Sequence, residues 1–597
     1  MSVFLQNWIH RLEEGAGVAV IRFATATIVF FSLMMVHHLR ESRSLGAPEA
    51  MDAAQLGRSI ARGEGFETKF IRPYAIQLTQ VKTGVSPDLT QPFQDVSNAP
   101  AWPWLLGKVF RLTASEENLQ AEGQEVALEL EKRIRWLNQI LFYLVLVVLF
   151  RTAVKLFDER VAWLSVILLG GANVFWNLTL AGVSVLLSTL LLLLSVWAFV
   201  SAVIGEGEKE WGAARVVAGM LVAGLLFGLC GLTSYGLLWL LIPFAVVVPA
   251  SLGRFKVPAT IAFLLAVLVV VVPWLMRNQG LSGQFFGTAG SVVYADTLRF
   301  PEDRLERGLF PPDSASAQDA KDYSVQEHWM KFRGNIGKML TDFIPGMAGG
   351  WIFGFFIAGL MLSFSRPVLT RLRWLLMGGI MIMTLVQALG QSRMLDITTG
   401  MSAENYLLNL GPLVVLFGVA MFSTLLDQMA GEDLPFQRIV MSALCVLLCL
   451  PLVIRLLEPK QSIELNPPYY PEIIAEGASW LEEDEWMMSD MPWAVAWYGD
   501  RECVWCTWDV DREFIALHRA RPIAALYLTS VTLDRKLVSE LERGENKLWG
   551  MLATEAIVNG EIPVAFPLEE GFSEWFPWQL YLSDKPRWQD RAANIPK

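Results

Sequence analysis

The sequence is poor in charge and in the residues that bind metals or form disulfide frameworks. Asp, Glu, Lys and Arg make up only 18% of the 597 residues, whereas 53% are hydrophobic. A soluble protein of this length would not be so apolar, so the composition predicts a polytopic membrane protein. Five cysteines are too few for a disulfide framework, and the five histidines show no metal-ligand spacing. The net charge of −11 gives no indication of a nucleic-acid partner.

Two signals are missing as well. The first apolar run, from Gly17 to about Val36, is long enough to span a membrane, and no convincing small-residue cleavage site follows it. We therefore expect a retained membrane span rather than a cleaved signal peptide. No G-x-G-x-x-G loop occurs in a context that would bind a nucleotide.

What the chain has instead is a series of long apolar segments. Eleven stretches of about twenty residues are predicted to cross the membrane. They are 17–37, 137–157, 160–177, 182–203, 213–233, 235–251, 256–276, 346–365, 373–391, 405–427 and 437–456. Lys and Arg gather in alternate short loops, as at Arg151, Lys155 and Arg160, which places the N-terminus in the cytoplasm. An odd number of spans then places the C-terminal segment outside.

The predicted fold class is a polytopic α-helical membrane protein with a C-terminal soluble α/β domain on the outer face. Residues 1–456 form the membrane module, with large outer loops at 38–136 and 277–345. Residues 457–597 form the outer domain, because apolar runs typical of strands alternate there with helical stretches. A bacterial inner membrane is the most natural location for such a chain.

The stretch from Asp52 to Pro73 follows the first span and is the leading candidate for a site. A helix from Asp52 to about Arg62, broken at Gly63, is predicted to lie on the membrane surface. Asp52, with Glu49 three residues earlier, is a candidate general base or a carboxylate that assists a divalent cation. The alternative is that Asp52 is only the N-cap of this helix.

Cations near the same surface are candidates for binding a lipid phosphate. They are Lys69, Arg72 and Arg277, the last followed by Asn278 at the outer end of the seventh span. The alternative for each is an interfacial anchor that contacts anionic headgroups. Arg393, Glu404 and Tyr406 flank the short outer loop before the tenth span and are placed to line the same site from the other side. The Cys503-Val504-Trp505-Cys506 motif lies in extended chain, which does not favour a redox role.

Taken in order, these features resemble the GT-C superfamily of polyprenyl-phosphate-sugar glycosyltransferases, in the branch of the protein O-mannosyltransferases and the bacterial lipid A aminoarabinose transferase. The motifs that carry the resemblance are listed in chain order: Glu49 with Asp52-Ala53-Ala54-Gln55, Gly63-Glu64-Gly65-Phe66, Pro100 with Pro103, Ala223-Gly224-Leu225 through Gly231-Leu232-Thr233-Ser234-Tyr235, and Pro273-Trp274 with Arg277-Asn278. The resemblance covers roughly residues 15–455. Ala53 stands where the family often has a second acidic residue.

The resemblance implies an integral membrane enzyme that moves a hexosyl or pentosyl group, with inversion, from a polyprenyl-phosphate-sugar donor to a lipid, glycan or protein acceptor on the outer face. It implies that Asp52 is the catalytic acidic residue. A divalent cation stays open as a cofactor. Two other functions stay open: a transporter or flippase for lipid-linked glycans, and a catalytically degenerate scaffold. Scarce charge within the spans argues against the transporter.

Overall fold

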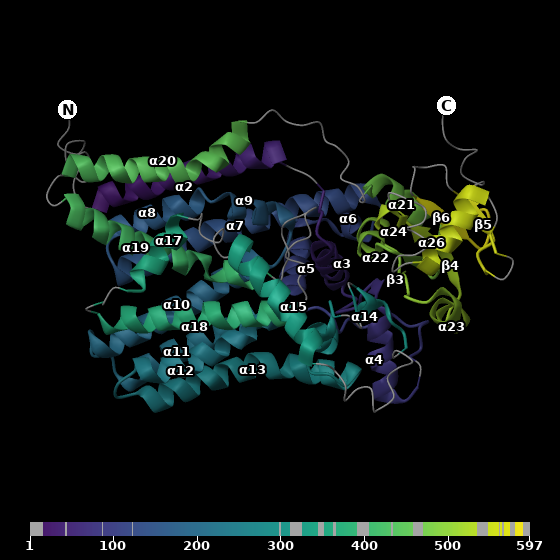
Figure 1. Ribbon diagram of the computed structural model, residues 1–597, viewed down its shortest axis with the longest axis horizontal. Coiled ribbons are helices and arrows are strands. Elements are labelled where there is room, and N and C mark those ends of the chain that lie inside the picture. Colours follow the sequence, from purple (N-terminus) through teal and green to yellow (C-terminus); the bar gives the residue numbers. More distant parts are fainter. Residues whose placement is uncertain are drawn as a thin grey trace.

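The computed structural model describes residues 16–588, apart from 42–43, 86, 122, 298–299, 302, 311–324, 344–350, 362–363, 365, 391–404, 431–433, 458–469, 534–546, 560–561, 564–565 and 573–578. Its main body is a bundle of long apolar helices (Figure 1). They are α2 (Ala16–Glu41), α7 (Gln124–Leu156), α10 (Val185–Gly207), α11 (Ala213–Gly231), α13 (Lys256–Ser282), α18 (Pro367–Leu389), α19 (Gly411–Ala430) with the preceding turn η5 (Tyr406–Leu410), and α20 (Leu434–Leu457).

The described residues contain fewer full-length spans than the eleven predicted from the sequence. Among the described residues, eight helices are long and apolar enough to cross a membrane, or nine if α8 (Glu159–Gly170) and α9 (Asn173–Ala181) together form one span. That pair is bent by 55°, and its break follows Gly170-Gly171, where a Cβ at Gly171 would lie 2.2 Å from Cys449 Sγ of α20.

One predicted span is short. The segment 235–251 consists of η1 (Tyr235–Leu240) and α12 (Leu241–Ser251) and forms a shorter apolar helix. Hydrophobicity alone predicted a full span there, because it does not reveal where a helix ends. The predicted span 346–365 contains α17 (Trp351–Gly359), and its residues 346–350, 362–363 and 365 lie outside the described residues.

The first large loop forms α3 (Pro48–Arg62), β1 (Phe70–Ile71), α4 (Pro73–Thr83), α5 (Ala101–Thr113) and α6 (Glu116–Gln120). The prediction for α3 was wrong in two respects. The helix starts at Pro48 with Ala47 as its N-cap, so Asp52 lies inside the helix and is not a cap. Eleven of its fifteen residues are buried, so it is an internal helix and not one on a membrane surface.

The second large loop contains η2 (Gly287–Tyr294), α14 (Arg304–Arg307), α15 (Val325–Lys338) and η3 (Met339–Phe343). The C-terminal region contains α21 (Pro471–Ser479), β2 (Trp486–Ser489), α22 (Pro492–Ala494), η6 (Val495–Gly499), β3 (Cys503–Trp505), η7 (Val510–Phe514), α23 (Ile515–Ala520), β4 (Ile523–Leu528), α24 (Ser530–Leu533), α26 (Lys547–Thr554), η8 (Glu555–Asn559), β5 (Glu570–Phe572) and β6 (Leu580–Ser583).

The strands form one mixed sheet in the order β1-β3-β2-β4-β6-β5, which confirms the predicted α/β character of the C-terminal region. The first four strands in this order pair in parallel, and β6 is antiparallel to both of its neighbours, β4 and β5. The edge strand β1 comes from the first large loop, with Phe70 paired to Cys503. The sheet therefore crosses the predicted domain boundary at residue 456, and the loop and the C-terminal region share one core.

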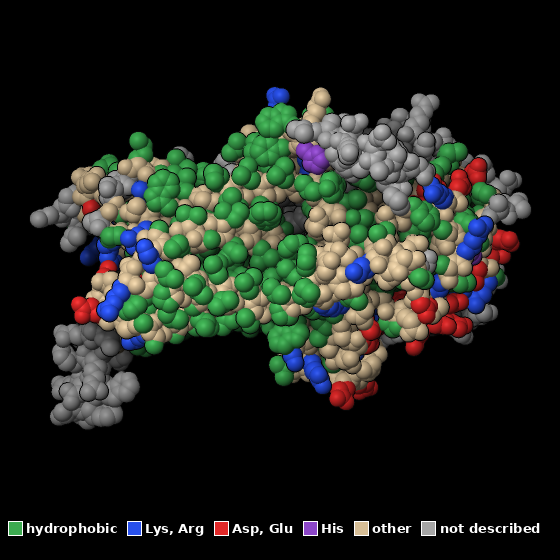
Figure 2. Space-filling model, turned by 90° about the horizontal axis from the view of Figure 1, so that it is seen from below, with side chains coloured by type: hydrophobic (Ala, Val, Ile, Leu, Met, Phe, Trp, Pro, Cys, Tyr) green, Lys and Arg blue, Asp and Glu red, His purple; other side chains and the backbone are tan. Residues whose placement is uncertain are grey.

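The non-membrane elements gather at one end of the bundle. Figure 1 shows α3, α4, α5 and α14 toward the C-terminal strands at the right, whereas α19 lies at the left end of the bundle. Figure 2 shows a broad hydrophobic surface over the bundle, while most acidic side chains on that face lie at the end that holds the C-terminal region. The two large loops and the C-terminal region thus lie on the same side of the apolar body.

Candidate functional site

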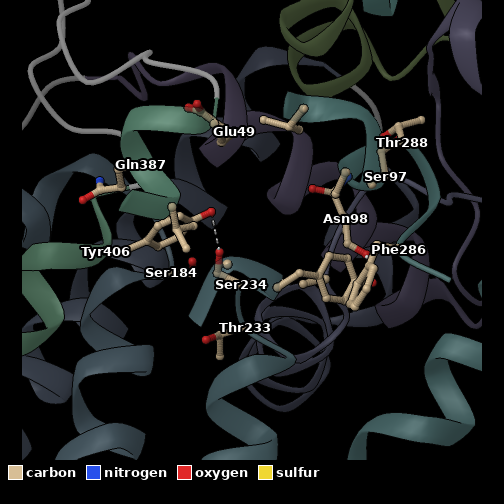
Figure 3. Close-up of a pocket in the computed structure, with 18 of the residues that line it drawn as sticks. Glu49, Ser97, Asn98, Ser184, Thr233, Ser234, Phe286, Thr288, Gln387 and Tyr406 are labelled. Atoms are coloured by element: carbon tan, nitrogen blue, oxygen red, sulfur yellow. Dashed lines mark hydrogen bonds between the residues drawn. The ribbon is translucent and has the colours of Figure 1, made fainter. Parts of the chain in front are cut away.

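A cavity of about 710 Å³ lies where the first large loop meets the membrane helices. In Figure 3, Tyr406 and Gln387 lie across it from Asn98, Ser97 and Phe286. The charged side chains among its described lining residues are Glu49, Asp52, Arg72 and Glu306. The cavity therefore joins two elements of the first loop, α3 and the start of α4, to α14 of the second loop.

Three side chains donate hydrogen bonds to Asp52 at the charged end of the cavity. Its carboxylate accepts hydrogen bonds from Arg72 Nη2 at 2.7 Å and Asn98 Nδ2 at 2.9 Å on Oδ2, and from Gln55 Nε2 at 3.1 Å on Oδ1. Gln55 can reach it because positions i and i+3 lie on the same face of a helix. With only 2% of Asp52 exposed, the carboxylate is fixed in orientation and shielded from bulk water.

Arg72 connects this carboxylate to the rest of the cavity. It precedes α4 as its N-cap, and its guanidinium lies over the Phe70 ring, 4.0 Å from the centroid. Nη2 contacts Asp52, Nε lies 3.6 Å from Glu306 Oε2, and Nη1 is buried with no hydrogen-bond partner among the described residues. A buried N–H group without an acceptor is costly, so Nη1 is suited to an anion that enters the cavity.

Arg277 lies behind the site. Its Nη1 donates to the backbone carbonyl of Asp95 at 2.8 Å, and its guanidinium lies over the rings of Phe66 and Trp274. Asn278 donates to the Tyr235 hydroxyl at 3.2 Å. Neither Arg277 nor Asn278 belongs to the described residues that line the cavity, so in this structure both support the wall around it.

Lys69 does not belong to the described residues that line the cavity. Its ammonium lies 2.7 Å from Asp500 of the C-terminal region, which also pairs with Arg58 at 2.9 Å and Arg62 at 2.7 Å. Burial acts to raise the pKa of Asp500, but Arg58, Lys69 and Arg62 hold it below its usual range. This cluster, which we call the Asp500 clamp (Arg58, Arg62, Lys69 and Asp500), joins α3 to the C-terminal region.

The remaining predicted residues divide into two groups. Glu49 and Tyr406 line the cavity, and the Ser234 hydroxyl donates to the Tyr406 hydroxyl at 3.3 Å. Arg393 and Glu404 fall outside the described residues. The structure thus brings together Asp52, Glu49, Arg72 and Tyr406, but it places Lys69, Arg277 and Asn278 around the cavity rather than in it.

One side of the cavity is apolar. Trp239 and Ile242 from η1 and α12, and Leu385 and Leu389 from α18, line it and are themselves between 36% and 55% exposed. α12 packs against α18 in the apolar body, so the cavity combines a charged end with a hydrophobic side.

A metal ion has no evident place here. Within the described parts of the chain, no group of three or more His, Cys, Asp or Glu side chains is arranged to hold one. Both oxygens of Asp52 are already engaged by Arg72, Asn98 and Gln55.

The cysteine pair of the C-terminal region does not have the properties of a reactive site. The thiols of Cys503 and Cys506 are buried, and burial raises the pKa of Cys506 to about 12, whereas a reactive cysteine has a lowered pKa.

Sequence reasoning missed Asp95, Asn98 and Glu306, which surround Asp52 and Arg72, as well as Arg58 and Asp500 in the clamp. For Asp95 a signal existed: an Asp followed by Ser97 and Asn98 is typical of a side-chain-capped turn. For Glu306 and Asp500 no local signal exists, because their partners lie hundreds of residues away in the sequence.

Comparisons with known proteins place these features in context. Residues 119–276 match the family described as dolichyl-phosphate-mannose-protein mannosyltransferase, and no curated protein sequence matches the chain. ArnT from Cupriavidus metallidurans bound to undecaprenyl phosphate aligns with a TM-score of 0.53 at 12% identity, over 96% of this chain and 99% of that chain. The archaeal oligosaccharyltransferase AglB from Archaeoglobus fulgidus, in complex with an inhibitory peptide and a dolichol-phosphate, aligns with a TM-score of 0.52 at 11% identity, over 96% of this chain and 74% of that chain. At such identities the structural likeness establishes the fold.

Proposed function

We propose that this chain, whose residues 119–276 match the dolichyl-phosphate-mannose-protein mannosyltransferase family and whose fold resembles that of ArnT, transfers a sugar from a polyprenyl-phosphate-sugar donor to a lipid, glycan or protein acceptor. The observation that carries this proposal is the pair formed by Asp52 and Arg72 at the charged end of a cavity whose other side is apolar. A carboxylate that accepts a proton and a cation that contacts a leaving phosphate are the two groups such a transfer needs.

The proposed mechanism follows from the positions of these groups. The donor's lipid chain lies along Trp239 and Leu385, and its phosphate contacts Arg72 Nη1. Asp52 takes the proton from the acceptor hydroxyl or amine as that atom attacks the anomeric carbon. The bond from this carbon to the phosphate oxygen breaks, the configuration inverts, and the polyprenyl phosphate leaves with its added charge stabilised by Arg72.

Other predicted residues take supporting roles in this proposal. Glu49 lines the same cavity and is placed to orient the acceptor, as is Tyr406 from the opposite wall. Arg277 supports the loop beside Asp52, and Lys69 fixes α3 through the Asp500 clamp. A phosphate contact by Arg72 alone replaces the three-cation site expected from the sequence.

The test is transfer in reconstituted liposomes, with a panel of radiolabelled polyprenyl-phosphate sugars and an envelope extract as acceptor. We expect Asp52→Asn to lower transfer by at least about 100-fold, because a general base contributes a factor of roughly 10²–10⁴. The matched control is Asp88→Asn in the same loop, an exposed residue whose carboxylate accepts from Thr90. Undiminished transfer by Asp52→Asn would remove Asp52 from the mechanism, and wild-type protein that flips the donor without transfer would favour a transporter.

We also propose that the cavity opens on the outer face, with the N-terminus in the cytoplasm, because Lys and Arg gather at the opposite ends of the spans. A cysteine introduced at exposed Thr90 is then labelled by a membrane-impermeant maleimide in intact cells, whereas one at exposed Lys209 is labelled only after permeabilisation. The reverse labelling pattern would show that the orientation is inverted.

A further inference from the structure

A short turn beside Asp52 is held by the side chain of Asp95. Asp95 Oδ2 accepts the backbone N–H groups of Ser97 at 3.2 Å and Asn98 at 2.8 Å, which closes the turn on itself. The Asn98 amide then donates to Asp52 Oδ2 at 2.9 Å and lies 3.4 Å from Asp95 Oδ1. A single amide group thus bridges two carboxylates, one inside the cavity and one behind it.

The turn is also held from outside. Arg277 donates to the Asp95 carbonyl, the Tyr235 hydroxyl donates to the Asn98 carbonyl at 3.3 Å, and the Asp95 N–H bonds to Phe66. Gly287, at φ +55°, packs so closely that a Cβ there would lie 1.7 Å from the carbonyl oxygen of Val96. These contacts hold residues 95–98 from outside. The Asn98 amide can therefore move mainly when the hydrogen bonds to the Asp95 carboxylate weaken.

The surroundings of Asp95 are unusual for a carboxylate that only caps a turn. It is 1% exposed, and burial followed by the charge of Asp52 raises its pKa to about 6. Arg72, the N–H of Asn98 and Arg277 act in the opposite direction. The charged or titratable groups that face it are therefore Asp52 from α3, Arg72 before α4, Tyr235 from η1 and Arg277 from α13.

We propose that Asp95 is a positioning residue for the transfer reaction: its carboxylate fixes the turn 95–98 so that the Asn98 amide holds Asp52 in its reactive orientation. This inference rests on the proposed function. Asp95 does not belong to the described residues that line the cavity, so it acts through Asn98 and not on the substrate. A charged carboxylate is the stronger acceptor for two N–H groups, so protonation of Asp95 loosens the turn and releases Asp52.

The test compares kcat and donor KM at about pH 5 and about pH 7.5 for the wild type, Asp95→Asn, Asn98→Ala and the double variant. At the higher pH we expect Asp95→Asn to lower kcat about 10-fold, with the donor KM changed less than about twofold, because orientation is lost while donor binding is kept. At the lower pH the ratio of wild type to Asp95→Asn approaches one, because wild-type Asp95 is then protonated.

The double variant tests the route of the effect. If Asp95 acts through Asn98, the double variant loses no more activity than Asn98→Ala alone. Asp88→Asn serves as the control with unchanged kcat at both pH values. Losses that multiply in the double variant, or a wild-type to Asp95→Asn ratio that is the same at both pH values, would overturn the proposal and leave the proposed function intact.

A second measurement does not depend on transfer. Hydrogen exchange of the Ser97 and Asn98 amides is expected to be faster in Asp95→Asn than in the wild type at about pH 7.5 and equal at about pH 5. If the variant and the wild type exchange these amides at equal rates at both pH values, the proposal is overturned. If wild-type protein transfers no sugar from any donor, the proposed function fails, and the exchange measurement still decides whether the Asp95 carboxylate controls the turn.

Discussion

At the scale of single residues, the site consists of two carboxylates that share their polar surroundings. Asp52 is paired with Arg72, whereas Asp95 is buried beside it with a raised pKa. Two like charges that close together disfavour each other's ionised form, unless cations and N–H groups compensate. Here Arg72 and the turn amides compensate, and Arg72 and Asn98 both donate to Oδ2 of Asp52. Functional sites commonly carry such a cost in stability.

For the Asp95→Asn variant we expect thermal stability and transfer activity to change in opposite directions. Because its folded pKa of about 6 lies above its unfolded value, its contribution to stability is full below about pH 4 and is lost as the pH rises through about 6. We therefore expect Asp95→Asn to raise the apparent melting temperature by a few degrees at pH 7.5 and to leave it unchanged at pH 4, although the variant transfers sugar more slowly. Differential scanning fluorimetry of the purified protein checks this, and a variant that is less stable at pH 7.5 would contradict it.

At the scale of elements, the position of Asp52 depends on how closely α3 approaches α5. The two helices meet at Gly57 and Gly107. A Cβ at Gly107 would lie 2.8 Å from Ile60 Cβ and 2.9 Å from the Gly57 carbonyl oxygen, and one at Gly57 would lie 2.8 Å from Leu106 Cβ. Since α5 follows the turn 95–98 directly, this crossing fixes the distance between Asp52 and Asn98.

Gly107→Ala is expected to separate α3 from α5 and to destabilise the protein by about 1–3 kcal/mol, the usual cost of overpacking. Transfer is expected to fall as well, although no polar group is removed. The control is Gly207→Ala at the end of α10, where a Cβ would meet no atom within 4 Å. Thermal unfolding and transfer assays on both variants check this; the same stability for Gly107→Ala and Gly207→Ala would show that the crossing is not close in solution.

At the scale of the whole molecule, the C-terminal region is part of the site's support. It receives β1 as an edge strand, and the Asp500 clamp ties it to α3. The Trp497 and Tyr498 side chains of η6 both donate to Glu131 of α7, at 3.0 and 2.8 Å. On the other side, Arg307 of α14 donates to the Cys506 carbonyl at 2.7 Å, next to the cavity residue Glu306. The region therefore fixes elements on two sides of the cavity.

Asp500→Asn is expected to destabilise the molecule by about 3–5 kcal/mol, because it leaves Arg58 and Arg62 buried without their partner. Transfer is expected to fall although Asp500 lies outside the cavity lining. Since the folded pKa of Asp500 is lowered, the wild-type clamp contributes stability above the unfolded pKa near 4 and loses it as the pH falls further. Wild type and variant should therefore approach each other in thermal stability at strongly acidic pH.

The measurement is limited proteolysis together with thermal unfolding, and the control is Asp511→Asn, an exposed residue of the same region. A C-terminal region that is cleaved no faster in Asp500→Asn than in Asp511→Asn would show that the clamp does not hold it in place.

The sequence by itself determined the membrane class, the mixed α/β C-terminal region and the resemblance to GT-C glycosyltransferases, because apolar length, strand patterning and ordered motifs are local properties. It also singled out Asp52, Glu49, Arg72 and Tyr406, which the structure brings to one cavity. Only the tertiary structure decided that Lys69 belongs to the Asp500 clamp and that Arg277 donates to the backbone of the turn 95–98. The local sequence around a Lys or Arg near a membrane does not show whether its side chain binds a phosphate or a carboxylate. Its partner, Asp500 for Lys69, is distant in the chain and is chosen by packing.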